Sequence, residues 1–126
     1  MANRDFKDVQ ALERELKLIA GRVTFSSSGA TVTTNAGSGF TVARDGSNPG
    51  EYIVTLTDKY TDLLHCSATY VQIAGSDTLF AQVEAHDVAS AKTVEIHLVN
   101  DAGSATAPSD TDQMTFLLVL KNSSVK

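Results

Sequence analysis

The stretch that decides the fold is Leu79-Phe-Ala-Gln-Val-Glu-Ala-His-Asp-Val-Ala-Ser-Ala-Lys-Thr-Val-Glu-Ile-His-Leu-Val-Asn100. Apolar and polar residues alternate over 79–87 and again over 92–100, and a period of two is the pattern of a half-buried β-strand. The short segment 88–91 between these runs predicts a hairpin. Its inner face is expected to carry Ala81, Val83, Ala85, Val94, Ile96 and Leu98. Its outer face is expected to carry Gln82, Glu84, His86, Thr93, Glu95 and His97, with His86 opposite Thr93 and His97 opposite Gln82.

Similar strand patterns lie on both sides of this hairpin. The segment Glu51-Tyr-Ile-Val-Thr-Leu-Thr57 alternates cleanly, and the segment 58–64 after it is expected to be a loop with one helical turn. The other expected strands are 22–28, 30–34, 40–44, 66–74 and 114–121. About eight short strands separated by frequent turns predict a mainly β domain, either an antiparallel β-sandwich or a jelly-roll-like fold.

The last expected strand contains the run Phe116-Leu-Leu-Val-Leu120, which is apolar on both faces. Such a strand lies either in the centre of a sheet or at an interface. Phe116 and Leu118 are therefore candidates for subunit contacts.

The chain before Gly21 has a different pattern and predicts an amphipathic α-helix from Asp5 to Ala20. Asp5 is a suitable N-cap, and Gly21 is a suitable C-terminal stop. The apolar stripe of this helix consists of Phe6, Val9, Leu12, Leu16 and Ile19, at the spacing of two heptads. The sequence thus divides into a helical segment, 1–21, and a β-sandwich domain, 22–126.

Two partners for this stripe remain open: the chain's own β-domain, or another copy or partner protein. Two heptads are marginal for a helix on its own, because isolated helices shorter than about 12–15 residues barely hold in water. Asp8, Glu13 and Glu15 flank the stripe, and their like charges oppose a parallel coiled coil.

The composition excludes several classes of function. The 126 residues fit one domain, the net charge is −5, and the ten basic residues are scattered, which argues against nucleic-acid binding. The apolar run 116–120 is too short to span a membrane. Residues 1–4 lead directly into charged residues and not into an apolar signal core, so the chain is expected to be synthesised in the cytoplasm.

No motif for chemistry is found, so we predict no enzymatic activity, no cofactor and no metal. The hairpin histidines His86 and His97 are diagonal and have no third ligand in the pattern, whereas zinc needs three or four ligands. The one cysteine, Cys66, is expected to be a small buried residue without an activating partner, since His65 points to the opposite face of a strand.

The order of these features resembles small virion proteins of tailed bacteriophages. The resemblance rests on the start Met1-Ala-Asn-Arg4, on the strand Gly50-Glu-Tyr-Ile-Val-Thr-Leu56, and on Asp58-Lys-Tyr60 with Leu63-Leu64 after it. It also rests on the apolar strand and polar tail at Leu117-Leu-Val-Leu-Lys-Asn-Ser-Ser-Val125. The chain is similar to capsid decoration (cement) proteins and to head-fibre or tail-fibre modules.

This resemblance implies a homotrimer of β-sandwich domains on the capsid surface of a virion, bound to the major capsid protein. It implies as an alternative a fibre or receptor-binding module that recognises a glycan on the host surface. The residues expected at the oligomer or capsid interface are Phe6, Val9, Leu12, Leu16, Ile19, Phe116 and Leu118.

Overall fold

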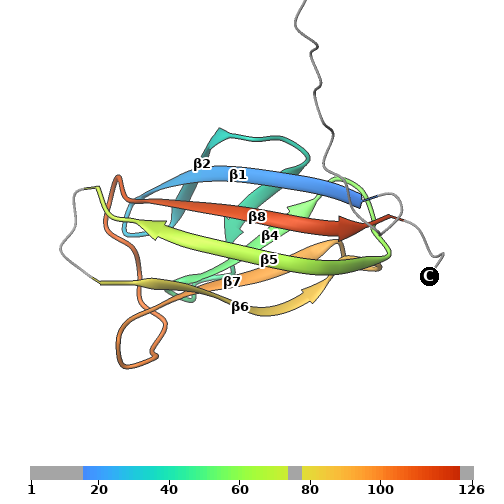
Figure 1. Ribbon diagram of the computed structural model, residues 1–126. Helices are drawn as coiled ribbons and strands as arrows, with labels where there is room; N and C mark the ends of the chain where they lie inside the picture. The colour runs from blue at the N-terminus through green and yellow to red at the C-terminus, as the bar shows by residue number, and fades with distance from the viewer. Residues whose placement is uncertain (1–15, 74–77, 123–126) are drawn as a thin grey trace, which may run out of the picture.

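The structure is a computed structural model, and it describes residues 16–73 and 78–122 (Figure 1). Eight β-strands and no helix make up this part of the chain. The strands are β1 (Leu16–Ser26), β2 (Thr31–Ala36), β3 (Phe40–Arg44), β4 (Glu51–Leu56), β5 (Asp62–Val71), β6 (Phe80–Asp87), β7 (Thr93–Val99) and β8 (Gln113–Lys121).

The strands form two four-stranded antiparallel sheets, which confirms the predicted mainly β class. Sheet A has the order β2-β1-β8-β5, and sheet B has the order β3-β4-β7-β6. The sheets lie face to face in Figure 1. The chain crosses between them after β2, β4, β5 and β7, and the edge strands approach each other as the pairs β2–β3 and β5–β6.

The core fills the space between the two sheets with side chains from both. Phe25 on β1 and Tyr52 on β4 place their ring centroids 4.8 Å apart, and Phe40 on β3 and Phe116 on β8 meet edge to face at 4.9 Å. Each aromatic pair therefore joins sheet A to sheet B. The fully buried side chains include Val23, Phe25, Tyr52, Val54, Val94, Ile96, Leu98, Met114, Leu118 and Leu120.

The helix predicted from Asp5 to Ala20 is wrong at its C-terminal end. Residues 16–20 belong to β1, where Leu16 lies opposite Lys121 and Ile19 lies opposite Leu118. The ladder between β1 and β8 satisfies the backbone and buries Ile19, so tertiary pairing overrides the local helical pattern. The rest of the predicted helix, with Phe6, Val9 and Leu12, lies outside the described residues.

Gly21 lies inside β1, so it is neither a helix stop nor the end of a structural segment. A Cβ atom at this position would come within 2.3 Å of Cζ of Phe40 and 2.7 Å of Cζ of Phe116. Glycine is needed here because the edge-to-face pair of rings occupies the space that a side chain would fill.

The hairpin of β6 and β7 is confirmed, with one change of register. Gln82 lies opposite His97 as predicted, but the register shifts between Val83 and Ala85. The β-bulge places His86 opposite Val94, whereas the sequence predicted Thr93 as its partner. It also leaves Ala85 exposed, whereas the sequence predicted it on the inner face. An extra residue in one strand leaves no trace in the alternation that the sequence shows.

The segment 58–64, predicted as a loop with a helical turn, is partly strand. β5 begins at Asp62, and Leu63 pairs with Leu120 before a bulge at Leu64. These residues pair with β8 because the backbone N–H and C=O groups on that side of β8 also need hydrogen-bond partners.

Asp112 is the one polar or charged side chain that is buried within the described part of the chain. Its Oδ1 accepts a hydrogen bond of 2.8 Å from the backbone N–H of Ile73, and its Oδ2 accepts one from the hydroxyl of Tyr70. Its backbone carbonyl also accepts the N–H of Phe25 at 2.9 Å. Asp112 thus fastens the C-terminal ends of β5 and β1 to the turn before β8.

We expect Asp112→Ala to lower the free energy of unfolding by about 3 kcal/mol, because it removes two hydrogen bonds to a buried carboxylate, one from the half-buried Tyr70 hydroxyl and one from the Ile73 N–H. Urea denaturation followed by circular dichroism measures the change. Asp101→Ala, in an exposed loop, is the control and should change stability by less than about 0.5 kcal/mol. Equal effects of the two substitutions would contradict this role of Asp112.

Candidate functional site

The structure places the predicted interface residues in three different environments. Ile19 is 5% exposed, Phe116 4% and Leu118 0%, so these side chains belong to the core and offer no surface to a partner. Leu16 stays half-buried at the surface. Phe6, Val9 and Leu12 lie outside the described residues. The run 116–120 is apolar on both faces, but the polar residues Thr115 and Lys121 beside it mark the outward face, so Phe116 and Leu118 turn inward.

The neighbours of these core residues point the other way, to the outer face of sheet A, because side chains alternate along a strand. Leu18 is 42% exposed and Leu117 is 37% exposed. We call the apolar part of this outer face the outer patch; it consists of Leu16, Leu18, Ala20, Leu117 and Val119. Two cross-strand pairs form its centre, Leu18 with Val119 and Ala20 with Leu117.

Polar residues surround the outer patch on the same face. Farther along β1, Arg22 lies opposite Thr115. On the β5 side, His65 is paired with Val119 and Ser67 with Leu117. This apolar centre with a polar rim is the anatomy of a protein–protein interface.

Two further features make the outer patch suitable for a partner. Leu64, in the bulge of β5 between Leu63 and His65, is also exposed, at 41%. The partner strand β2 pairs with β1 only from Arg22 to Ser26, so among the described strands the part of β1 before Arg22 is bordered by β8 alone. Covering the remaining exposed part of one such leucine is worth about 1 kcal/mol.

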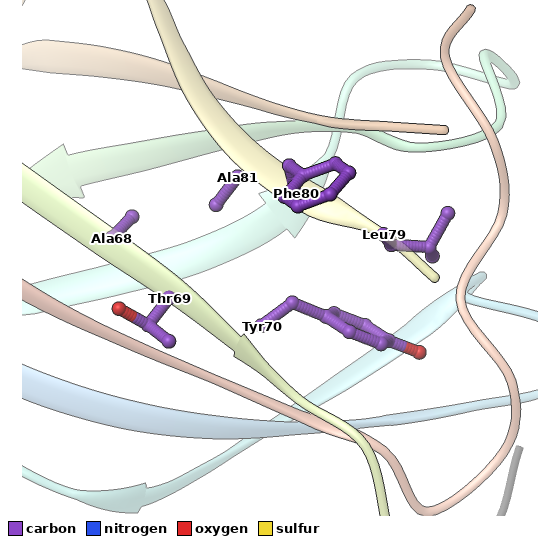
Figure 2. Close-up of a pocket in the computed structure, with 6 residues that line it drawn as sticks. All are labelled: Ala68, Thr69, Tyr70, Leu79, Phe80 and Ala81. Carbon is purple, nitrogen blue, oxygen red and sulfur yellow. The ribbon is translucent and has the colours of Figure 1, made fainter. Parts of the chain in front are cut away.

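A groove lies between the edge strands β5 and β6 (Figure 2). It has a volume of about 380 Å³ and is lined by Ala68, Thr69, Tyr70, Leu79, Phe80 and Ala81. The small side chains Ala68 and Ala81 leave this space open where the sheets meet, and the ring of Phe80 is 54% exposed beside it. The lining is uncharged, so the groove offers an apolar contact and no acid or base.

The histidines do not converge on a metal site. Nδ1 of His97 lies 3.7 Å from a carboxylate oxygen of Glu84, and His86 and His65 are exposed. Within residues 16–73 and 78–122, no group of three or more His, Cys, Asp or Glu side chains could hold a metal ion. The absence of a metal in the whole protein stays a prediction.

Cys66 lies on β5 opposite Leu118, half-buried against the core. Burial raises the pKa of its thiol from 9.0 to about 11. The thiol is therefore protonated at neutral pH, and a protonated thiol is a poor nucleophile.

We expect Cys66 to react with a disulfide reagent such as DTNB about 100-fold more slowly in the folded protein than in denaturant near pH 8, because two pKa units lower the thiolate fraction by that factor. The rate in the folded protein should rise as the pH increases towards 11. Stopped-flow absorbance measures both rates. Equal rates in the folded and denatured protein would contradict a buried, protonated thiol.

No protein-family model matches the chain, and neither the curated proteins nor the solved structures gave a match to it. The described residues contain no helix that is long and apolar enough to cross a membrane. The surface geometry and the sequence are thus the basis for a functional proposal.

Proposed function

We propose that this chain is a structural virion protein, a β-sandwich that decorates and stabilises a phage capsid through symmetric protein–protein contacts. The observation that carries the proposal is the outer patch, where leucine and valine side chains lie on a sheet face that the described chain leaves uncovered. Contacts of this kind, repeated by symmetry, add up to tight binding although each is weak.

The sequence supports the same class of function. The resemblance to small virion proteins covers most of the chain, including the strand at Gly50–Leu56 and the apolar strand at its C-terminal end. A decoration protein needs broad surfaces and not a deep pocket, because a standard interface buries about 1,600 Å² in total over comparatively flat areas.

The second candidate is a fibre or receptor-binding module that recognises a host surface glycan. The exposed ring of Phe80 beside the groove between β5 and β6 favours it, since ligand sites combine aromatic walls with a hollow. Binding to a glycan array that is lost in Phe80→Ala would support this candidate over capsid decoration.

Capsid binding tests the main proposal. We expect the purified chain to co-sediment, to saturation, with capsids of the phage that encodes it after these have been stripped of the protein. Leu117→Asp should reduce the amount bound at least tenfold, because a carboxylate in the outer patch opposes its burial in a contact. Quantitative gel densitometry of the pellets measures binding.

Thr115→Asp is the matched control for this experiment. Thr115 lies on the same strand and the same outer face, two residues before Leu117, but opposite Arg22 in the polar rim. It should bind capsids nearly as well as the unchanged chain. Capsids that stay undecorated with excess unchanged protein would overturn the proposed function.

A further inference from the structure

We infer that the outer edge of β5 pairs with β5 of a second copy of this chain, antiparallel across a two-fold axis. Residues 65–71 form the paired stretch, and the two A sheets then join into one sheet of eight strands. This self-association goes beyond the proposed function, and it leaves the outer patch uncovered for the capsid contact.

Three of the four edge strands carry features that oppose pairing with another strand. In sheet A, β2 has six residues, and its pairing with β1 skips Asn35. In sheet B, β3 has five residues and ends in Arg44, whereas β6 has a bulge at Glu84 and ends at Asp87. Short edges, bulges and charged side chains are the means by which proteins keep an edge strand from adding further strands.

The fourth edge strand, β5, lacks these features over residues 65–71. It is the longest of the four, with ten residues, and after its bulge at Leu64 every residue from His65 to Val71 pairs regularly with β8. The stretch 65–71 contains no Pro, Asp, Glu, Lys or Arg. Among the described strands only β8 forms a ladder with β5, so the other side of this backbone is a template for one more strand.

The groove between β5 and β6 adds an apolar contact at the same edge. Ala68, Thr69 and Tyr70 line it from β5, and residues 79–81 line it from the other side (Figure 2). The ring of Phe80 beside it is 54% exposed. A strand added to the edge of β5 continues sheet A across the mouth of this groove, so one contact would supply both a backbone ladder and a cover for the apolar side chains.

The side chains of β5 are complementary to one another in an antiparallel register. A two-fold axis at Ala68, the middle residue of 65–71, places Ala68 opposite Ala68 of the second copy. On the inner face, Cys66 then lies opposite Tyr70, so a small side chain meets a large ring. On the exposed outer face, Ser67 lies opposite Thr69, and pairs of hydroxyl side chains stabilise antiparallel strands.

The charges of the chain are also compatible with a second copy as the partner. The net charge is −5, so two copies repel each other where their acidic side chains meet. In the register centred on Ala68 no like charges lie opposite each other, because His65 faces Val71. Asp62 precedes the bulge and lies outside the paired stretch. The β5 edge thus lets the chain meet itself without charge repulsion.

The resulting dimer is closed. An isologous contact uses the same surface on both copies, and the edges that remain are the short, bulged or charged ones, so growth stops at two chains. Antiparallel partners keep corresponding side chains on the same face of a sheet, so both outer patches face the same side. Two patches on one side can bind one capsid surface together.

Light scattering after size exclusion measures the assembly of the full chain. The unchanged chain should have a mass of about 27 kDa, twice 13.4 kDa. Ser67→Lys combined with Thr69→Lys should raise the dimer Kd at least about tenfold, because lysines then lie directly opposite each other. About 1 M salt should restore part of the affinity by screening this repulsion.

Thr31→Lys combined with Thr33→Lys is the matched control. These two exposed threonines have the same spacing on β2, the other edge of sheet A, and this variant should remain a dimer. Circular dichroism checks that both double variants are folded. For the unchanged chain, the mass of one chain at every concentration tested, or the mass of three chains, would overturn the inference.

Disulfide trapping gives an answer even if the lysine variants fail to fold. In a Cys66→Ala background, Ala68→Cys should form a disulfide-linked dimer under mild oxidation, because residue 68 lies opposite its own copy. His65→Cys in the same background is the control. Residue 65 is exposed, but in this register it is about 20 Å from its copy, six residues along the strand. Equal yields of linked dimer from the two variants would contradict the inferred pairing.

Capsid binding separates this inference from the proposed function. Leu117→Asp should keep the mass of the dimer, since Leu117 lies on the outer face of β8 and not at the edge of β5, although it should lose capsid binding. A dimer that binds no capsid would refute the proposed function and leave the inference standing. A monomer that binds capsids would refute the inference alone.

Discussion

The pairing of β8 with strands on both sides is the interaction on which the rest of the structure depends. β8 forms nine residue pairs with β1 and nine with β5, so it is an inner strand of sheet A that is paired along its whole length on both sides. One of its faces supplies Met114, Phe116, Leu118 and Leu120 to the core, and its other face supplies Leu117 and Val119 to the outer patch. A strand that is apolar on both faces therefore contributes to two surfaces at once: one lies inside the core, and the other is not covered by the described chain.

Apolar ring contacts join the two sheets, and hydrogen bonds of Asp112 add a connection within sheet A. In the centre, the ring pairs of Phe25 with Tyr52 and Phe40 with Phe116 join the layers by apolar contact. Near one end, the buried carboxylate of Asp112 ties β5 to the turn before β8 through directional hydrogen bonds. Between the edges of β5 and β6, the small side chains Ala68 and Ala81 leave the groove open.

The sequence predicts the class and most strands because alternation with a period of two is a local property. It fails at residues 16–20, where the same apolar residues fit a heptad and a strand. A usable signal exists there: the phase that puts Val23 and Phe25 inside also puts Ile19 inside when it is extended backwards. The bulge at Glu84 depends on pairing across strands, and one sequence does not contain that information. The inward phase of 116–120 is readable from its flanks, because Gln113, Thr115 and Lys121 are polar whereas Met114 and Leu120 share the apolar face of Phe116 and Leu118. The side chains on the outer face of β8 are thus Leu117 and Val119, whereas Phe116 and Leu118 belong to the core.

The adjacency of Leu16 and Lys121 has a mechanical consequence. These residues are cross-strand partners, and β1 begins where β8 ends, at the same end of the molecule (Figure 1). Hydrogen bonds in an antiparallel pair run perpendicular to the strands. A pulling force applied between residues 16 and 121 would therefore load these bonds one after another, as in opening a zipper, and not all together in shear. Two strands loaded in this way separate at low force. A neighbouring molecule bound to the outer faces of β1 and β8 at this end would therefore resist their separation.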